Sequence, residues 1–383
     1  MQVIRLSLLL FLFSIFVAAQ SSTPVNAPWQ MQDSGTTASL RGIDSVDGTV
    51  AWASGTGGTV LKTIDGGAHW TKCAVPDAAT DGATLDFRGV QAWDATTAVV
   101  MASGPGDKSR LYETEDGCKT WRLILKNPDA PYGFFDSLSL MREQRTIRSD
   151  EGFGLLLGDS VRGELSIFET RDGGSSWTRI HDPLLRIEGK AFAASNGGIS
   201  RINATNDFVV NINEGSEELR LNYNGRYWLN DGSVLERTWN KVSIPLPAGA
   251  ESAGAFGVNS HVLIKYGKST SEVVGLQLFE VAVGGDYTKP NETAGTAVWS
   301  ADNGGHWTAS TIPPHGYRSS VQWIQGLKLW ITVGTNGSDV SRDDGKTWQP
   351  IDDGNWNALS LPFVVGPNGR IARMNLGAFA DKK

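Results

Sequence analysis

The octapeptide TRDGGSSW at residues 170–177 decides the fold of this chain, because close variants of it recur along the sequence. The shared pattern is Ser/Thr-x-Asp-x-Gly-x-x-Trp. It returns as TIDGGAHW at residues 63–70, TEDGCKTW at 114–121, SADNGGHW at 300–307 and SRDDGKTW at 341–348. The residues that define the five copies are Asp65, Trp70, Asp116, Trp121, Asp172, Trp177, Asp302, Trp307, Asp343 and Trp348. The long gap before the fourth copy predicts a degenerate copy at Asn230, Asp231 and Gly232.

Each position of the octapeptide suits a tight turn between two antiparallel strands. The Asp carboxylate and the Ser/Thr hydroxyl can bond turn amides, and Gly adopts a positive φ without steric cost. The Trp begins the next strand and is expected to bury its ring between neighbouring sheets. We therefore interpret the octapeptides as structural elements.

The segments around the octapeptides repeat as well. Each unit has three short predicted strands before its octapeptide and one after it, which predicts an all-β, seven-bladed β-propeller of four-stranded antiparallel blades. Six or eight blades remain possible, because the fourth and fifth units are irregular. The last unit lacks a fourth strand, and the N-terminal strand at residues 28–33 is expected to supply it and close the ring. The expected blades span residues 37–75, 85–126, 134–182, 190–244, 253–313, 317–351 and 355–376.

Composition narrows the function classes. The chain of 383 residues carries 34 Lys and Arg against 41 Asp and Glu, a net charge of −7, which argues against nucleic-acid binding. With only 2 Cys, a disulfide-built scaffold, a four-thiolate zinc site and an iron–sulfur cluster are excluded. The histidines show no metal-ligand spacing, and no glycine pair precedes a helix that would bind a phosphate. We expect no metal and no cofactor.

The N-terminus has the features of a signal peptide. Arg5 precedes an apolar run at residues 6–17, and the small residues Ala18 and Ala19 end it. The run is too short to span a membrane, so we expect cleavage after Ala19, no stable membrane insertion, and one propeller domain at residues 20–383. The mature protein is expected in the periplasm or outside the cell.

The octapeptide matches the Asp box, or BNR repeat, of sialidases, sortilin-type receptors and related propellers, where the boxes lie away from the active site. Three further stretches resemble the bacterial relatives of the photosystem II stability/assembly factor family. They are the first-strand phrases around Arg41 and Arg88, GGDYTKP at 284–290, and GYRSS at 316–320. The resemblance implies a lumenal or periplasmic factor that binds assembling proteins, with no established reaction.

A binding site is expected on the face opposite the octapeptides, near the central channel. Arg41, Arg88 and Arg318 occupy similar early positions in three innermost strands and are predicted to converge there. The full candidate set for a ligand or protein partner is Arg41, Arg88, Asp136, Asp159, Ser195, Asn196, Asp286, Tyr287, Lys289, Tyr317 and Arg318. Under one interpretation the arginines grip a carboxylate of a partner. Under the other, they pair with Asp136, Asp159 and Asp286 as buried ion pairs.

Two functions remain open on these residues. The first is a non-enzymatic propeller that binds a protein partner in the cell envelope. The second is a sialidase-like glycoside hydrolase or a carbohydrate-binding protein that takes a glycan. Its catalytic groups would come from Asp136, Asp159, Asp286 and Tyr317, with the three arginines on a substrate carboxylate.

The two cysteines are expected to pair. Cys118 stands where the other octapeptides have Gly, which adds strain if the turn needs a positive φ. Cys73 follows Trp70 in the fourth strand of the first unit, and an exported protein folds in an oxidising compartment. The sequence therefore predicts a Cys73–Cys118 disulfide, against the alternative of two free thiols.

Overall fold

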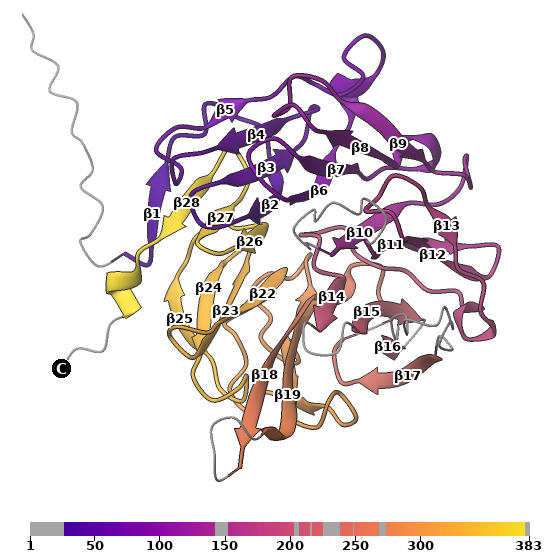
Figure 1. Ribbon diagram of the computed structural model, residues 1–383. Helices are drawn as coiled ribbons and strands as arrows, with labels where there is room; N and C mark the ends of the chain where they lie inside the picture. The colour runs from indigo at the N-terminus through magenta and orange to yellow at the C-terminus, as the bar shows by residue number, and fades with distance from the viewer. Residues whose placement is uncertain are drawn as a thin grey trace, which may run out of the picture.

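The computed structural model describes residues 27–141, 152–202, 207–214, 217–224, 238–247, 249–267 and 273–379. The expected signal peptide and the degenerate octapeptide at 230–232 lie outside these residues. Within them, the strands form seven four-stranded antiparallel sheets that surround a central axis (Figure 1). No helix in this part of the chain is long and apolar enough to cross a membrane.

The sheets follow the chain in order, and we number them one to seven. Sheet one holds β2 (Leu40–Ser45), β3 (Ala51–Gly55), β4 (Val60–Thr63) and β5 (Thr71–Lys72). Sheet two holds β6 (Phe87–Ala92), β7 (Ala98–Ala102), β8 (Arg110–Thr114) and β9 (Arg122–Lys126). Sheet three holds β10 (Phe135–Leu140), β11 (Gly154–Val161), β12 (Glu164–Thr170) and β13 (Thr178–Arg179). Sheet four holds β14 (Ile199–Ile202), β15 (Asp207–Glu214), β16 (Glu217–Asn224) and β17 (Thr238–Ile244).

Sheets five to seven complete the series. Sheet five holds β18 (Ala253–Tyr266), β19 (Val273–Asp286), β20 (Ala297–Ser300) and β21 (Thr308–Ala309). Sheet six holds β22 (Ser320–Ile324), β23 (Leu329–Gly334), β24 (Gly337–Ser341) and β25 (Gln349–Asp352). Sheet seven holds β26 (Ala358–Ser360), β27 (Phe363–Val365), β28 (Ile371–Met374) and β1 (Trp29–Gln32). Short 3₁₀ helices lie at η1 (Gly82–Thr84), η2 (Gly106–Lys108), η3 (Pro183–Leu185) and η4 (Leu376–Phe379).

The first strands of the sheets form a closed ring. Each of β2, β6, β10, β14, β18, β22 and β26 contacts the next, and β26 contacts β2. The N-terminal strand β1 completes sheet seven by pairing with β28, with Trp29 opposite Met374. The indole Nε1 of Trp29 donates to Ser338 Oγ of sheet six at 2.9 Å, which ties this strand to its neighbour. These contacts confirm an all-β propeller of four-stranded antiparallel blades that is closed by an N-terminal strand.

The core lies between neighbouring sheets. The strands β3 and β7 are buried along their whole length, because both faces of each are covered by adjacent sheets. One cluster shows the arrangement, since Trp52 of sheet one packs with Phe87 and Val90 of sheet two. Stability therefore comes from apolar contacts between sheets rather than from one central core.

The octapeptides form the expected turns. In the first copy, Thr63 Oγ1 accepts the Gly67 amide at 2.9 Å, and Asp65 Oδ1 accepts the His69 amide at 3.0 Å. The fourth and fifth positions have positive φ in every copy, for example 73° at Gly66 and 86° at Gly67. The Trp of each copy packs into a cluster that includes the preceding sheet. The turn role predicted for the octapeptides is confirmed.

The predicted disulfide is also present. Cys73 follows β5 in sheet one, Cys118 lies in the octapeptide of sheet two, and their Cα atoms are 5.3 Å apart. Both cysteines are buried. Cys118 has a φ of 68°, so it occupies a backbone conformation that glycine adopts in the other copies. The covalent link therefore joins two sheets at a strained position.

Candidate functional site

A cavity of about 580 Å³ opens at the start of the first strands. Its walls come from β2, β6, β10, β11 and β18 and from the segments that precede β14, β22 and β26. It therefore lies at one mouth of the central channel and receives side chains from all seven sheets. A cavity of this size suits a small ligand or a short peptide segment.

Four of the lining side chains stand at β-bulges, where the pairing of two strands shifts by one residue. The register of β2 on β3 shifts between Leu40 and Gly42, which leaves Arg41 as an extra residue. The same kind of bulge leaves out Arg88 in β6, Asp136 in β10 and Phe256 in β18. A β-bulge turns its extra residue away from the regular alternation of a strand. All four of these residues line the cavity.

Two of these residues, Arg41 and Arg88, place their guanidinium groups around the carboxylate of Asp86. Arg88 Nε donates to Asp86 Oδ2 at 2.8 Å, and Arg41 Nε lies 3.9 Å from Asp86 Oδ1, too far for a hydrogen bond. Within the described residues, Arg41 Nε has no hydrogen-bond partner although it is buried. Burial, followed by the charge of Arg88, lowers the pKa of Arg41, while Asp86 raises it. One carboxylate beside two guanidiniums leaves a positive charge that a bound anion would neutralise.

Two carboxyl groups line the adjacent wall. Asp136 is 2% exposed and its Oδ2 has no hydrogen-bond partner. Burial and then the nearby Asp159 raise the pKa of Asp136 well above its usual range, and Arg88 opposes the shift. Burial also raises the pKa of Asp159, whose Oδ1 accepts the Ala191 amide at 3.3 Å. Burial of this wall therefore disfavours the charged form of both carboxyl groups.

Another part of the cavity wall is aromatic. Phe256 stacks on Phe192 with ring centroids 4.1 Å apart and meets Tyr317 edge-on at 4.8 Å. Tyr287 contacts Phe256 edge-on at 6.2 Å and leaves half of its surface exposed at the cavity rim. The cavity thus holds both guanidiniums and aromatic rings, and the Arg88 guanidinium lies 5.7 Å from the ring centroid of Phe134, which also lines it. Such a combination suits a carboxylate attached to an apolar group.

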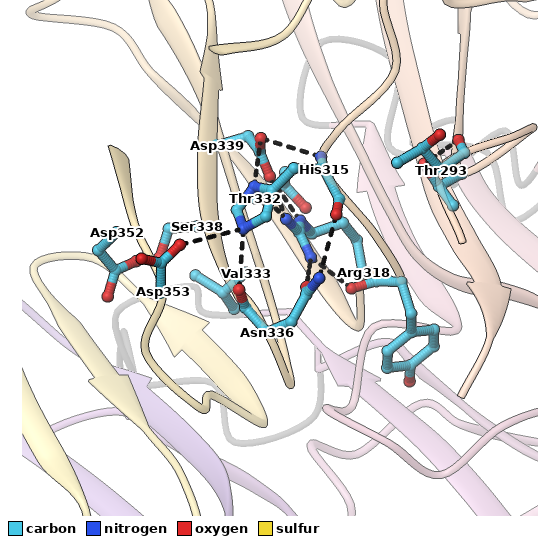
Figure 2. A network of polar contacts seen from close by, with 12 residues as sticks. Thr293, His315, Arg318, Thr332, Val333, Asn336, Ser338, Asp339, Asp352 and Asp353 are labelled. Atoms are coloured by element: carbon cyan, nitrogen blue, oxygen red, sulfur yellow. Dashed lines mark hydrogen bonds and ion pairs between the residues drawn. The ribbon is translucent and has the colours of Figure 1, made fainter. Parts of the chain in front are cut away.

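The predicted convergence of three arginines is wrong for Arg318, which is fully buried and does not line the cavity. Figure 2 shows it inside sheet six, where Nε donates to Asp339 Oδ2 at 2.7 Å and Nη2 donates to the same oxygen. Its Nη1 donates to Asn336 Oδ1 and to the Tyr317 carbonyl, each at 2.6 Å. His315 Nδ1 lies 2.8 Å from both Asp339 Oδ1 and Arg318 Nη2. Arg318 is therefore a structural residue.

The reason is the register of sheet six. In sheet one, the glycine that ends the second strand lies against the carbonyl of Ser39, two residues before the bulged Arg41. In sheet six the corresponding glycine lies against the carbonyl of Tyr317, so Ser319 is the residue equivalent to Arg41. Ser319 lines the cavity, and Arg318 takes the buried place before it. The predicted equivalence of Arg318 with Arg41 is therefore wrong by one residue.

The predicted site residues fall into two groups, those that line the cavity and those that do not. Arg41, Arg88, Asp136, Asp159, Tyr287 and Tyr317 line the cavity, whereas Ser195, Asn196, Asp286 and Lys289 do not. Ser195 Oγ donates to the Ser319 carbonyl, and Asn196 Oδ1 accepts the Leu138 amide. Asp286 accepts the amide and hydroxyl of Thr288 in its own turn, with Lys289 Nζ 3.7 Å away.

The second interpretation, in which the arginines pair with Asp136, Asp159 and Asp286, is not what the structure shows. Among the described residues, the arginines form salt bridges with Asp86, for the two cavity arginines, and with Asp339, for Arg318. Sequence reasoning missed Asp86, although it stands two residues before Arg88. It also missed Phe256, whose phrase AFG resembles the phrases LRG and FRG around the two arginines.

The sialidase-like arrangement is incomplete in the described residues. Only two of the three proposed arginines reach the cavity. Tyr317, the proposed nucleophile, is 3% exposed, and burial raises its pKa, which is the opposite of activation. The carboxylate of Asp286 accepts the Thr288 amide within its own turn and does not line the cavity. Of the proposed catalytic carboxyl groups, only Asp136 and Asp159 share the cavity.

Comparisons with known proteins agree with this architecture. No protein-family model matches the chain. The photosystem II assembly lipoprotein Ycf48 of Synechococcus sp. (strain CC9902) is 24% identical over 262 residues, which is 61% of this chain and 71% of that protein. The solved structure of YCF48 from Cyanidioschyzon merolae superposes with a TM-score of 0.56 at 18% identity, over 92% of this chain and 100% of the other. A structure of YCF48 bound to D1 peptide superposes with a TM-score of 0.53 at 16% identity, over 91% and 96%.

The chain is thus similar in sequence to a photosystem II assembly factor and similar in fold to two solved structures of that factor. The resemblance indicated by the sequence motifs is supported.

Proposed function

We propose that this protein is an exported, non-enzymatic propeller that binds a segment of a protein partner in the channel-mouth cavity. In this proposal Arg41 and Arg88 hold a carboxylate of the partner, and the aromatic wall packs against an adjacent apolar side chain. The observation that carries the proposal is the unpartnered Nε of Arg41 beside Arg88 on the wall of a cavity of about 580 Å³. Two guanidiniums that share one carboxylate leave donors for a further anion.

The similar proteins support a peptide ligand. One solved neighbour is described as YCF48 bound to D1 peptide, and the curated relative is described as a photosystem II assembly lipoprotein. An assembly-factor role for this chain follows by analogy with those proteins. The export part of the proposal rests on the apolar run at residues 6–17 and gains support from the Cys73–Cys118 disulfide, because disulfides persist in oxidising compartments.

The test is a binding screen of the mature chain against a peptide library with acidic members and neutral, amidated members of the same length. We expect acidic peptides to bind and Arg88→Ala to weaken them by about tenfold to a hundredfold, since one charge-assisted hydrogen-bonded contact contributes about 1.5–3 kcal/mol. Arg186→Ala is the matched control, because Arg186 is exposed and lies outside this cavity. Equal affinity for acidic and amidated peptides would contradict the carboxylate role, and a pull-down from the native envelope would then show whether a protein binds elsewhere.

A glycoside hydrolase is the second candidate, and the shared wall of Asp136 and Asp159 favours it. A raised carboxyl pKa suits a general acid. A glycosidase screen on the same purified protein tests this function. Turnover that Asp136→Ala abolishes would replace the binding proposal with an enzymatic one, whereas turnover that survives Asp136→Ala would exclude this pair as its site.

A further inference from the structure

Asp136 is a buried titratable residue that the proposed binding mode does not use. It stands at the bulge of β10, lines the cavity and is 2% exposed. Its Oδ2 is buried and has no hydrogen-bond partner within the described residues, and the two cavity arginines pair with Asp86 instead. A buried carboxyl oxygen without a partner is costly when it is charged, so this atom needs either a hydrogen-bonding ligand or a proton.

The elements packed against β10 bring few charges to this carboxyl group. β10 contacts β6, β7, β11 and β14. Arg88 of β6 and Asp159 of β11 line the cavity, and Lys190 lines it from the segment before β14. Arg201 of β14 does not line the cavity, and β7 has no titratable residue. The charged groups next to Asp136 are thus a second carboxyl group and a guanidinium that Asp86 already binds.

The other titratable groups of the cavity are less sensitive to a bound ligand. Glu251 and Lys190 pair with each other at 3.1 Å, and both side chains are largely exposed to solvent. Burial raises the pKa of Tyr317, so its hydroxyl stays neutral near pH 7. By contrast, burial and the neighbouring Asp159 already raise the pKa of Asp136. A negative charge placed in the cavity would therefore act most strongly on the ionisation of Asp136.

We propose that Asp136 takes up a proton when the cavity binds a carboxylate, and that its neutral carboxyl group donates a hydrogen bond to that carboxylate. The inference rests on the proposed function, because Arg41 and Arg88 are the groups that hold a carboxylate in the cavity. Two neighbouring carboxyl groups in a buried site ionise together only at a large cost, whereas one proton between them forms a charge-assisted hydrogen bond. Asp136 is then a ligand-binding residue that selects an acceptor oxygen on the ligand.

The proton comes from the solvent, and the ligand keeps its charge. Ionised Asp136, one solvent proton and the ligand carboxylate combine into a complex in which Asp136 holds the proton. Because this complex holds more protons than its free components, the affinity falls as the pH rises, by at most about tenfold per pH unit. The opposite sign would mark a different binding mode. A ligand whose N–H group is held by ionised Asp136 would release a proton and bind more tightly at higher pH.

Isothermal titration calorimetry of the mature chain tests the proposal. The ligand is an acidic peptide of the library whose only titratable group is one Glu and whose termini are blocked, so its carboxylate is ionised above about pH 6. Titrations from about pH 6 to about pH 8.5, each in two buffers of different ionisation enthalpy, give the number of protons taken up per peptide. We expect net proton uptake and an affinity that falls across this range.

Two variants assign the proton. Asp136→Asn donates a hydrogen bond from its amide at every pH, so it should abolish the uptake and bind with an affinity that does not change with pH. Asp159→Asn removes a charge that favours the proton on Asp136, so it should keep the uptake and move the fall in affinity to lower pH. Asp353→Asn is the matched control, since its side chain is 98% exposed and does not line the cavity. Near-UV circular dichroism checks that each variant is folded.

Four results would overturn the proposal. Peptide binding that Arg88→Ala weakens but that takes up no proton removes this inference and leaves the proposed function intact. Proton release on binding shows that ionised Asp136 accepts a hydrogen bond from the ligand. Uptake that persists in Asp136→Asn and disappears in Asp159→Asn places the proton on Asp159. Absence of binding to any acidic peptide removes both this inference and the proposed function.

Discussion

Removal of Asp339 should destabilise the protein strongly, because it leaves the buried Arg318 without a counter-ion. Both side chains have no exposed surface. Asp339 accepts hydrogen bonds from Arg318 Nε and Nη2, and its Oδ1 accepts the His315 amide at 3.1 Å. After Asp339→Ala, Arg318 would keep only neutral partners, which are Asn336 and Tyr317 on Nη1 and the ring nitrogen Nδ1 of His315 beside Nη2.

The magnitude follows from the chemistry of buried charge. Burial already lowers the pKa of Arg318, and Asp339 is the main group that opposes the shift. Breaking a buried ion pair by removing one partner costs about 3–5 kcal/mol. With a urea m-value of about 3 kcal/mol/M, the unfolding midpoint should fall by roughly 1 M or more. Urea titration followed by tryptophan fluorescence measures the shift.

The control is Asp353→Ala, because the Asp353 side chain is 98% exposed and lies 3.9 Å from His315. Exposed pairs contribute at most about 1 kcal/mol, so its midpoint should barely move. The double variant Arg318→Met/Asp339→Leu should recover much of the loss, since apolar groups need no counter-ion. If Asp339→Ala unfolded at the same urea concentration as Asp353→Ala, the buried pair would not be a major source of stability.

Two further predictions concern the turns. The disulfide joins residues 45 positions apart, so the chain-entropy account predicts that Cys73→Ala/Cys118→Ala lowers the free energy of unfolding by about 4 kcal/mol. Urea titration without reductant measures this loss. The variant Cys73→Ala/Cys118→Gly should be about 1–2 kcal/mol more stable than the double alanine variant, because glycine tolerates the φ of 68°. Equal stability of the two variants would show that the turn carries no strain. Hydrogen bonds within the octapeptide turns, chiefly from the His69 amide, the Thr120 hydroxyl and the His306 amide, lower the pKa values of Asp65, Asp116 and Asp302 to about 2. Since these folded-state pKa values lie below the unfolded ones, the stabilisation is complete above about pH 4 and should be lost as the pH falls toward 2. A series of urea midpoints measured at different pH values should therefore fall in this range, and Asp65→Asn should make the fall smaller.

Much of the architecture could be predicted from the sequence because its signals are local. The Asp, Gly and Trp of each octapeptide act within eight residues, and their turn needs consecutive positive φ angles that few residues adopt. Repetition of that turn marks five of the four-stranded units. Even the disulfide followed from a local anomaly, the replacement of glycine by Cys118 in one copy.

The candidate site could be predicted only in part. Arg41 and Arg88 were found because each precedes a glycine in similar first-strand phrases. The bulges that turn these arginines, and Asp136 and Phe256, toward the cavity leave no sequence signal of their own. The length of β18 and β19, 14 residues each, likewise leaves no sequence signal, since strand length shows only when the pairing is known.

The sequence by itself determined the turn geometry, the order of the strands and the closure of the ring, because each depends on residues that are neighbours in the chain or repeat at regular intervals. Only the tertiary structure decided which arginines reach the cavity. Arg318 resembles Arg41 in its local sequence, but a displacement of one residue reverses the direction of a side chain in a strand. Asp339, which lies on another strand, then holds Arg318 inside sheet six.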